Sequence, residues 1–170
     1  MLILLFKKIG RVNAIHFYSK ASRICRIRYI DIVSLYPYCC KYKPYPKFHP
    51  VVIRYNFNFQ IHAYFGVIKC KVLPPTNLFH PVLPVKIKNK LFFTLCYLCA
   101  KNSNASKCNH SDDDRSITAC WGTPELYVAL ENGYTLLEIY QVWHYDSKFE
   151  YIDENNTGLF GSYINKWLSE

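Results

Sequence analysis

The first 111 residues of this 170-residue chain contain almost no acidic side chains. Asp31 is the single carboxylate in that stretch, which carries eighteen lysine and arginine residues; residues 112–170 carry eleven acids and three basic residues. The net charge is +9. A basic half that is poor in acids and mixed with tyrosine and phenylalanine favours contact with a phosphate backbone. The alternative is an ordinary basic surface.

The chain also has no long hydrophobic run, no internal repeat and no convincing secretory signal. The short apolar segment Met1–Phe6 is followed by its lysines, whereas a secretory signal has them in front. No stretch approaches the length of a membrane span. We therefore expect an intracellular protein, nuclear or cytoplasmic, without a membrane partner. The eight cysteines then do not indicate a disulfide framework.

An apolar composition of 51%, with 17% aromatic residues, is ample for a packed core. The run Tyr29–Pro37 stands out because it sets Asp31 among apolar and β-branched residues. We predict a strand over residues 26–35 that Pro37 ends, because proline has no N–H to donate. Two roles for Asp31 stay open: a structural ion pair with Arg26 or Arg28, or a metal-binding carboxylate on a nucleic-acid surface.

The pattern Asp-x-x-Ser-Leu-Tyr-Pro over residues 31–37 resembles the first palm motif of family B DNA polymerases. Upstream, Gly-Arg-Val-Asn-Ala at 10–14 is similar to a run in the protein-primed members of that family, which occur in viruses, linear plasmids and large transposons. Segments 45–50 and 64–75 resemble the transposon-type branch. With these flanks in the right order, the resemblance covers most of the chain.

The resemblance implies a DNA-directed DNA polymerase that transfers nucleotides with Mg²⁺ during DNA replication. Asp31 would be the catalytic carboxylate shared by the metal ions, and the Ile32 carbonyl a further ligand. Ser34 and Leu35 would contact the triphosphate, and Tyr36 would lie under the sugar and exclude a 2′-hydroxyl. The implied DNA-binding residues are Gly10 and Arg11, although Ile9 replaces the first glycine of the family's pair.

The implied partners are a DNA template and primer, a deoxynucleoside triphosphate and a terminal priming protein. Two further motifs of the relatives, Lys-x3-Asn-Ser-x-Tyr-Gly and Asp-Thr-Asp, do not occur between Pro37 and Glu170. One carboxylate cannot hold two metal ions. We therefore expect these 170 residues to be a polymerase fragment that is inactive alone.

A second cluster has the spacing Cys-x2-Cys-x8-Cys-x-His, formed by Cys96, Cys99, Cys108 and His110. Thiolate and imidazole ligands at these spacings predict a structural Zn²⁺ site on one loop. The alternative is reduced buried cysteines beside a surface histidine. The three aspartates at 112–114 are predicted to form a solvated loop or a helix N-terminal turn, because adjacent side chains do not converge on one ion.

The predicted fold class is α+β: a partial polymerase palm with antiparallel strands and flanking helices, plus a cysteine-rich insertion. We expect a partial palm in 1–60, an insertion with strands and the Cys/His loop in 61–122, and a helix–strand continuation in 123–170. The predicted elements are an antiparallel pair from 51–57 and 62–73, a short strand pair within 85–95, a helix that Thr123 caps and Gly133 ends, a strand over 134–145 and a helix over 160–168.

A different function stays open from the residues alone. The chain would then be a zinc-stabilised nucleic-acid-binding module without catalysis, in which Asp31 is structural. A hydrolase with a Cys/His nucleophile pair has no local signature in this sequence.

Overall fold

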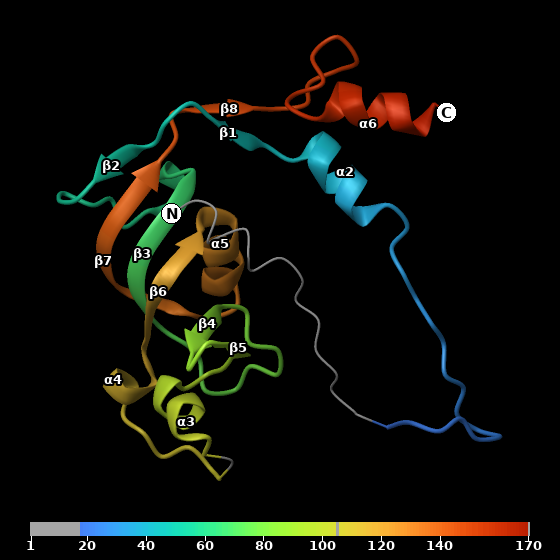
Figure 1. Ribbon diagram of the computed structural model, residues 1–170. Coiled ribbons are helices and arrows are strands. Elements are labelled where there is room, and N and C mark those ends of the chain that lie inside the picture. The colour runs from blue at the N-terminus through green and yellow to red at the C-terminus, as the bar shows by residue number, and fades with distance from the viewer. Residues whose placement is uncertain (1–17, 105, 170) are drawn as a thin grey trace. The chain divides into compact units, whose positions relative to one another are not determined.

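The computed structural model describes residues 18–104 and 106–169, and the chain divides into two compact units (Figure 1). The first unit combines the described parts of Met1–Lys43 and Tyr151–Glu170. The second unit is Pro44–Glu150. The second unit thus lies, in sequence, between the two segments that build the first.

A four-stranded antiparallel sheet in the order β2-β7-β3-β6 forms the centre of the second unit. Its strands are β2 (Val51–Ile53), β7 (Thr135–His144), β3 (Gly66–Leu73) and β6 (Ile117–Gly122). The predicted direct pairing of the first two β-type runs is wrong, because β7 lies between β2 and β3 and pairs with both. The ten-residue β7 pairs with β2 along one edge and with β3 along the other, so it is an inner strand of the sheet.

Alternation along the strands directs one face of this sheet into the core. Ile68 pairs with Trp121 of β6 on one side and with Val142 of β7 on the other, and all three side chains are fully buried. Side chains two positions apart lie on the same face of a strand, so Cys70 and Val72 are buried as well. The buried residues of the hydrophobic core all belong to the second unit.

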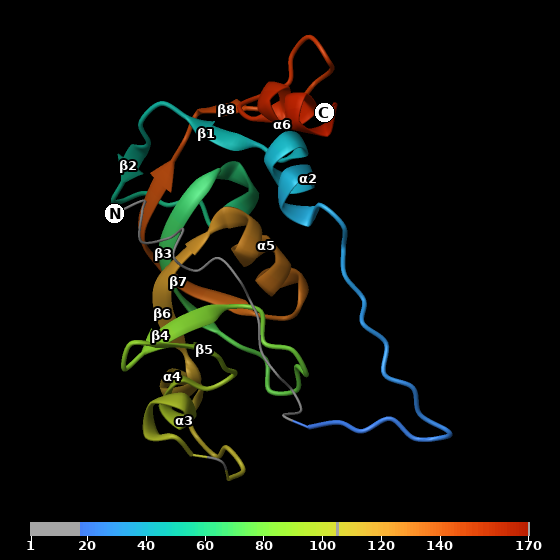
Figure 2. The ribbon, with the colours of Figure 1, turned by 45° about the vertical axis from the view of Figure 1, so that its right-hand side comes forward.

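Helix α5 (Thr123–Glu131) covers the core face of the sheet, as Figure 2 shows. Leu126 and Ala129 are its buried residues on that side, and Gly133 follows it with a φ of +84°. Gly122, not Thr123, is the N-cap. The predicted cap is wrong because the Thr123 hydroxyl faces the sheet, where it accepts the Gly66 N–H at 3.2 Å.

Smaller elements complete the second unit. The predicted short strand pair is confirmed as the hairpin of β4 (Pro84–Ile87) and β5 (Lys90–Phe93), and the strand predicted over 134–145 is β7. The strand β6 was not predicted from the sequence pattern. The remaining elements are β1 (Tyr45–Lys47), which pairs with β8 (Ser147–Phe149), the 3-10 helix η1 (Ile61–Ala63), and the helices α3 (Tyr97–Asn102) and α4 (Asp112–Arg115).

The first unit pairs helix α2 (Leu35–Tyr42) with helix α6 (Gly161–Leu168). The Tyr42 ring lies 4.9 Å from the ring of Tyr38 and 4.9 Å from that of Tyr151, and the Lys41 ammonium lies over two of these rings. Neither helix buries a large apolar side chain. This unit is therefore held by aromatic edges and not by a core of its own.

The strand predicted over residues 26–35 is wrong. The chain is extended there without a strand partner in the described structure, and it then turns into α2. Pro37 is the third residue of that helix, where the backbone N–H has no intrahelical acceptor, so a proline there loses no hydrogen bond. The same residue that was expected to end a strand is thus compatible with the start of a helix.

The mixed α/β class with antiparallel sheets is confirmed. Among the described helices, none has the length and apolar content needed to cross a membrane.

Candidate functional site

Asp31 lies in the extended segment before α2, with its side chain exposed to solvent. Within the part of the chain that the structure describes, it forms no ion pair with Arg26 or Arg28. The apolar neighbours Ile32 and Val33 are exposed as well. The carboxylate is thus accessible and has no fixed counter-ion among these residues.

A tight turn joins this segment to the helix. The Leu35 N–H donates to the Ile32 carbonyl at 3.3 Å, and Ser34 takes a left-handed conformation with a φ of +56°. The Ser34 carbonyl then accepts the Tyr38 N–H at 2.9 Å, the first bond of α2. The Ser34 hydroxyl makes no capping bond. It therefore stays available at the N-terminus of the helix, where partial positive charge accumulates.

Tyr36 lies in the first turn of α2, and 67% of its surface is exposed. Its ring thus presents an open aromatic surface five residues after Asp31 and two residues after Ser34. Among the described residues, Asp31 belongs to no group of three or more potential metal ligands. Gly10 and Arg11, the residues expected to contact DNA, lie outside the described residues.

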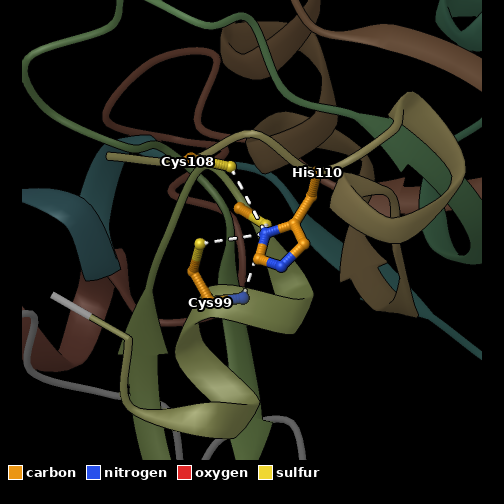
Figure 3. A group of neighbouring side chains, drawn as sticks. Cys99, Cys108 and His110 are labelled. Carbon is orange, nitrogen blue, oxygen red and sulfur yellow. Dashed lines mark hydrogen bonds between the residues drawn. The ribbon is translucent and has the colours of Figure 1, made fainter. Parts of the chain in front are cut away.

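The four predicted zinc ligands come together in the second unit. Cys96 is the N-cap of α3 and Cys99 lies in its first turn, while Cys108 and His110 follow on the segment that leads to α4. Their four ligand atoms lie within 4.8 Å of one another, and they are the single such group of Cys, His, Asp or Glu among the described residues. A span of fifteen residues thus closes around one point (Figure 3).

The distances in this group fit a tetrahedral ion. The His110 Nδ1 atom lies 3.4 Å from the Cys96 Sγ, 3.2 Å from the Cys99 Sγ and 3.5 Å from the Cys108 Sγ. With Zn–S and Zn–N bonds of about 2.3 and 2.05 Å, a tetrahedron has a sulfur–nitrogen edge of about 3.6 Å. Figure 3 shows the ring presenting Nδ1 to the sulfur atoms, so Nδ1 is the ring nitrogen that could bind an ion at this group.

Hydrogen bonds that involve the backbone of Cys96 and Cys99 stabilise the geometry of the cluster. The Cys99 N–H donates to the Cys96 Sγ at 3.4 Å, a bond that stabilises a thiolate at that sulfur. Thr94, which was not among the predicted site residues, donates its hydroxyl to the Cys96 carbonyl at 2.8 Å and accepts the Cys96 N–H at 3.1 Å. The sequence signal was a threonine two residues before the first ligand, which is a typical local side-chain turn.

The thiols of the cluster differ in acidity. Burial raises the pKa of Cys99 to about 12, and contacts with the Cys96 and Cys108 side chains add to the increase. The His110 backbone N–H lowers the pKa of Cys108 to about 7. Without a cation, three thiols this close disfavour a second thiolate, because like charges repel. A soft divalent cation bound at their centre would remove that repulsion.

The other candidates do not converge on a site. The aspartates 112–114 form the first turn of α4, where Ser111 is the N-cap, so the predicted helix N-terminal turn is confirmed. Asp112 pairs with Arg115 and Asp113 with Lys71. The five remaining cysteines lie outside the cluster: Cys25, Cys39, Cys40, Cys70 and Cys120.

The fold and the cluster together define a mixed α/β protein with antiparallel sheets and a Cys₃His group that could hold zinc. The model of one protein family, DNA polymerase type B, organellar and viral, matches residues 10–170. The chain therefore belongs to this family of polymerases, as the motif at 31–37 predicted. Searches of curated proteins and of solved structures return no match.

Proposed function

We propose that this chain carries the nucleotide-binding segment of a DNA-directed DNA polymerase, with Asp31 as a catalytic carboxylate. The supporting observation is the family match over residues 10–170 together with the exposure of Asp31, three residues before the N-cap of α2. The substrates would be a DNA template with its primer and a deoxynucleoside triphosphate.

The chemistry of residues 31–36 suits this role. Mg²⁺ is usually held by one or two carboxylates together with substrate phosphates, and Asp31 with the Ile32 carbonyl would supply oxygen ligands of that kind. When bound, the metal would stabilise charge on the transferring phosphate. Ser34 precedes α2 and Leu35 is the first residue of α2, where the positive end of the helix dipole favours phosphate oxygens, and the Ser34 hydroxyl would be free to donate to one. The exposed Tyr36 ring would contact the sugar and exclude a 2′-hydroxyl.

Several finer assignments belong to the same proposal. The protein-primed, transposon-type subclass and a terminal priming protein as partner rest on the sequence runs at 10–14, 45–50 and 64–75. Gly10 and Arg11 would contact the template. The division into a partial palm (1–60), an insertion (61–122) and a continuation (123–170) is part of this proposal. We also propose that residues 1–170 do not extend a primer alone, because one carboxylate does not hold two metal ions.

A paramagnetic experiment tests the Asp31 assignment directly. We expect Mn²⁺ with a deoxynucleoside triphosphate to broaden the amide NMR signals of residues 31–36 in the full chain, and Asp31→Asn to abolish this broadening. Glu154→Gln is the matched control, because Glu154 is another exposed carboxylate of the first unit. Broadening that persists in Asp31→Asn, or that Glu154→Gln removes equally, would refute the assignment. Primer extension by the purified chain with Mg²⁺ would refute the proposed inactivity.

We further propose that Cys96, Cys99, Cys108 and His110 bind one structural Zn²⁺. The purified chain is expected to contain about one zinc per molecule and to give the strong visible absorption of tetrahedral thiolate coordination when Co²⁺ replaces it. Cys99→Ser should lose both, whereas Cys25→Ser, an exposed cysteine outside the cluster, should keep both. A wild-type chain that folds without any bound metal would contradict this proposal.

The convergence of the four ligand atoms also favours a second candidate function, a zinc-stabilised nucleic-acid-binding module without catalysis. The two candidates differ at Asp31. In the polymerase, Asp31→Asn removes Mg²⁺ and Mn²⁺ binding and leaves zinc content and DNA affinity unchanged. In the module, the same substitution has no effect on metal–nucleotide binding, because there is none to remove.

A further inference from the structure

The β4–β5 hairpin presents three lysines around one tight turn. Lys86 lies on β4, Lys88 in the turn and Lys90 on β5, and all three are exposed. Lys88 and Asn89 form the two-residue turn, both with a positive φ, at +46° and +65°. The three lysines thus lie in or next to the turn of a two-stranded ribbon, with Lys86 and Lys90 on its two opposite faces, since Lys86 pairs with Leu91 and Lys90 with Ile87.

The stem of this hairpin is fixed on the core. Val85 and Ile87 are buried in the core of the second unit, and the Trp121 indole N–H donates to the Pro84 carbonyl at 2.8 Å. The position of the hairpin is therefore fixed by its packing on the core, while the lysine side chains at its turn remain exposed to solvent. Such a surface loses little conformational freedom when it binds a partner.

The charge at the tip is not neutralised within the described chain. None of the three lysines is part of an ion pair among the described residues. No carboxylate occurs between Asp31 and Asp112. In the acidic run that follows at 112–114, Asp112 pairs with Arg115, Asp113 pairs with Lys71, and Asp114 accepts the Ser111 hydroxyl. The hairpin thus keeps its full positive charge for an external anion.

The turn itself favours a residue other than lysine. A two-residue hairpin turn with positive φ at both positions prefers asparagine, aspartate or glycine, because a Cβ is crowded in the left-handed region. Asn89 meets this preference and Lys88 does not. A lysine at a position where it costs backbone energy is an observation that points to a use for its charge.

We propose that Lys86, Lys88 and Lys90 bind the phosphate backbone of duplex DNA. A two-stranded β-ribbon fits the major groove of B-form DNA, and lysines supply point charges that contact phosphates without reading sequence. The exposed residues of the hairpin include no aromatic ring on which a free base could stack, whereas single-strand binders use such rings. This contact adds to the proposed polymerase function, but it does not depend on Asp31 or on the zinc cluster.

Fluorescence anisotropy with a labelled 20-base-pair duplex tests the proposal on the full chain. Each lost phosphate contact should reduce the slope of log K against log salt concentration by about 0.9. For Lys86→Gln, Lys88→Gln and Lys90→Gln combined, we expect a slope smaller by about 2 to 3 and an affinity at 0.1 M salt at least about tenfold weaker. The corresponding triple arginine variant should restore most of the affinity.

The matched control removes three exposed lysines from the first unit, Lys20, Lys43 and Lys166. It lowers the net charge equally and should change the slope by less than about one. Equal losses in the two triple variants would overturn the proposal, because net charge alone would then explain the binding. Equal or tighter binding of a single strand of the same length would overturn the choice of duplex.

Lys88→Asn keeps the test independent of folding. Asparagine fits the left-handed turn better, so we expect this variant to melt at a higher temperature than the wild type and yet to bind the duplex several-fold more weakly. A variant that gains stability and loses no affinity would overturn the role of Lys88. If the triple glutamine variant loses DNA binding but keeps the Mn²⁺ broadening at residues 31–36, the hairpin surface and the proposed nucleotide site are independent of each other.

Discussion

Gly66 occupies a position in β3 that has no room for a side chain. Its φ is +150°, and a Cβ built there would lie 2.0 Å from the Trp143 carbonyl oxygen of the neighbouring β7. That oxygen is backbone and cannot move aside without breaking the pairing of the two strands. We expect Gly66→Ala to lower the free energy of unfolding by about 3 kcal/mol, measured by urea denaturation.

Gly122 is the matched control for this prediction. A Cβ at Gly122 would have its nearest neighbour at 3.7 Å, an ordinary contact with the Pro124 ring. Gly122→Ala should therefore change the unfolding free energy by less than about 1 kcal/mol. If the two substitutions cost the same, the steric account of Gly66 is wrong.

At this scale, sequence rules located the important residues better than they assigned their roles. Pro37 and Thr123 each mark a real boundary, but Pro37 lies in the first turn of a helix, and the Thr123 side chain bonds to β3 instead of capping α5. Both rules describe what a residue does to its own backbone. These local rules cannot predict a bond to a distant strand, such as the one that the Gly66 N–H donates to the Thr123 hydroxyl.

At the scale of elements, one buried cation anchors the short helix α4 to the sheet. Arg115 is buried, and its guanidinium donates to the Pro74 carbonyl at 2.6 Å and to the Asp112 carboxylate at 2.9 Å. Arg115→Ala would leave that buried carbonyl without its donor. We expect a loss of about 2–4 kcal/mol in unfolding free energy, measured by urea denaturation.

The neighbouring pair of Lys71 and Asp113 joins the same two elements but is open to solvent. Each partner stabilises the charge of the other: the bond lowers the pKa of Asp113 and raises that of Lys71. Surface pairs contribute little, so Lys71→Ala should cost less than about 1 kcal/mol in the same measurement. A larger loss for Lys71→Ala than for Arg115→Ala would contradict the assignment of the anchor.

Most elements were predictable where the local pattern was strong. The hairpin of β4 and β5, the strand β7 and the helices α5 and α6 follow from apolar periodicity and from turn residues such as Gly133. The extended segment over residues 26–35, which precedes α2, was predicted as a strand because Ile32 and Val33 raise strand propensity. Strand propensity needs a partner strand, and none pairs with this segment among the described residues.

At the scale of the whole molecule, stability should be concentrated in the second unit. The buried core residues all lie between Ile61 and Val142, and the two ends of the unit are paired strands, with Tyr45 opposite Phe149. We expect residues 44–150 expressed alone to melt in one cooperative transition, followed by circular dichroism, close to the main transition of the full chain. They should also retain the zinc.

The first unit provides the comparison. Its helices α2 and α6 bury no large apolar side chain, so a peptide that joins residues 18–43 to 151–169 should show no cooperative transition. A second unit that is unfolded without the first would refute this view of where the stability lies.

The family, through the motif at 31–37, and the four residues of the Cys/His group, through their spacing, could both be identified from the sequence alone. Both are encoded by residues close together in the chain, so local chemistry is enough to find them. The tertiary structure was needed to show that β7 lies between β2 and β3, that Nδ1 of His110 faces the thiols, and that the three lysines of the β4–β5 hairpin form no ion pair among the described residues. These features depend on which distant segments of the chain pack together. That packing is determined by the burial of apolar side chains over the whole second unit.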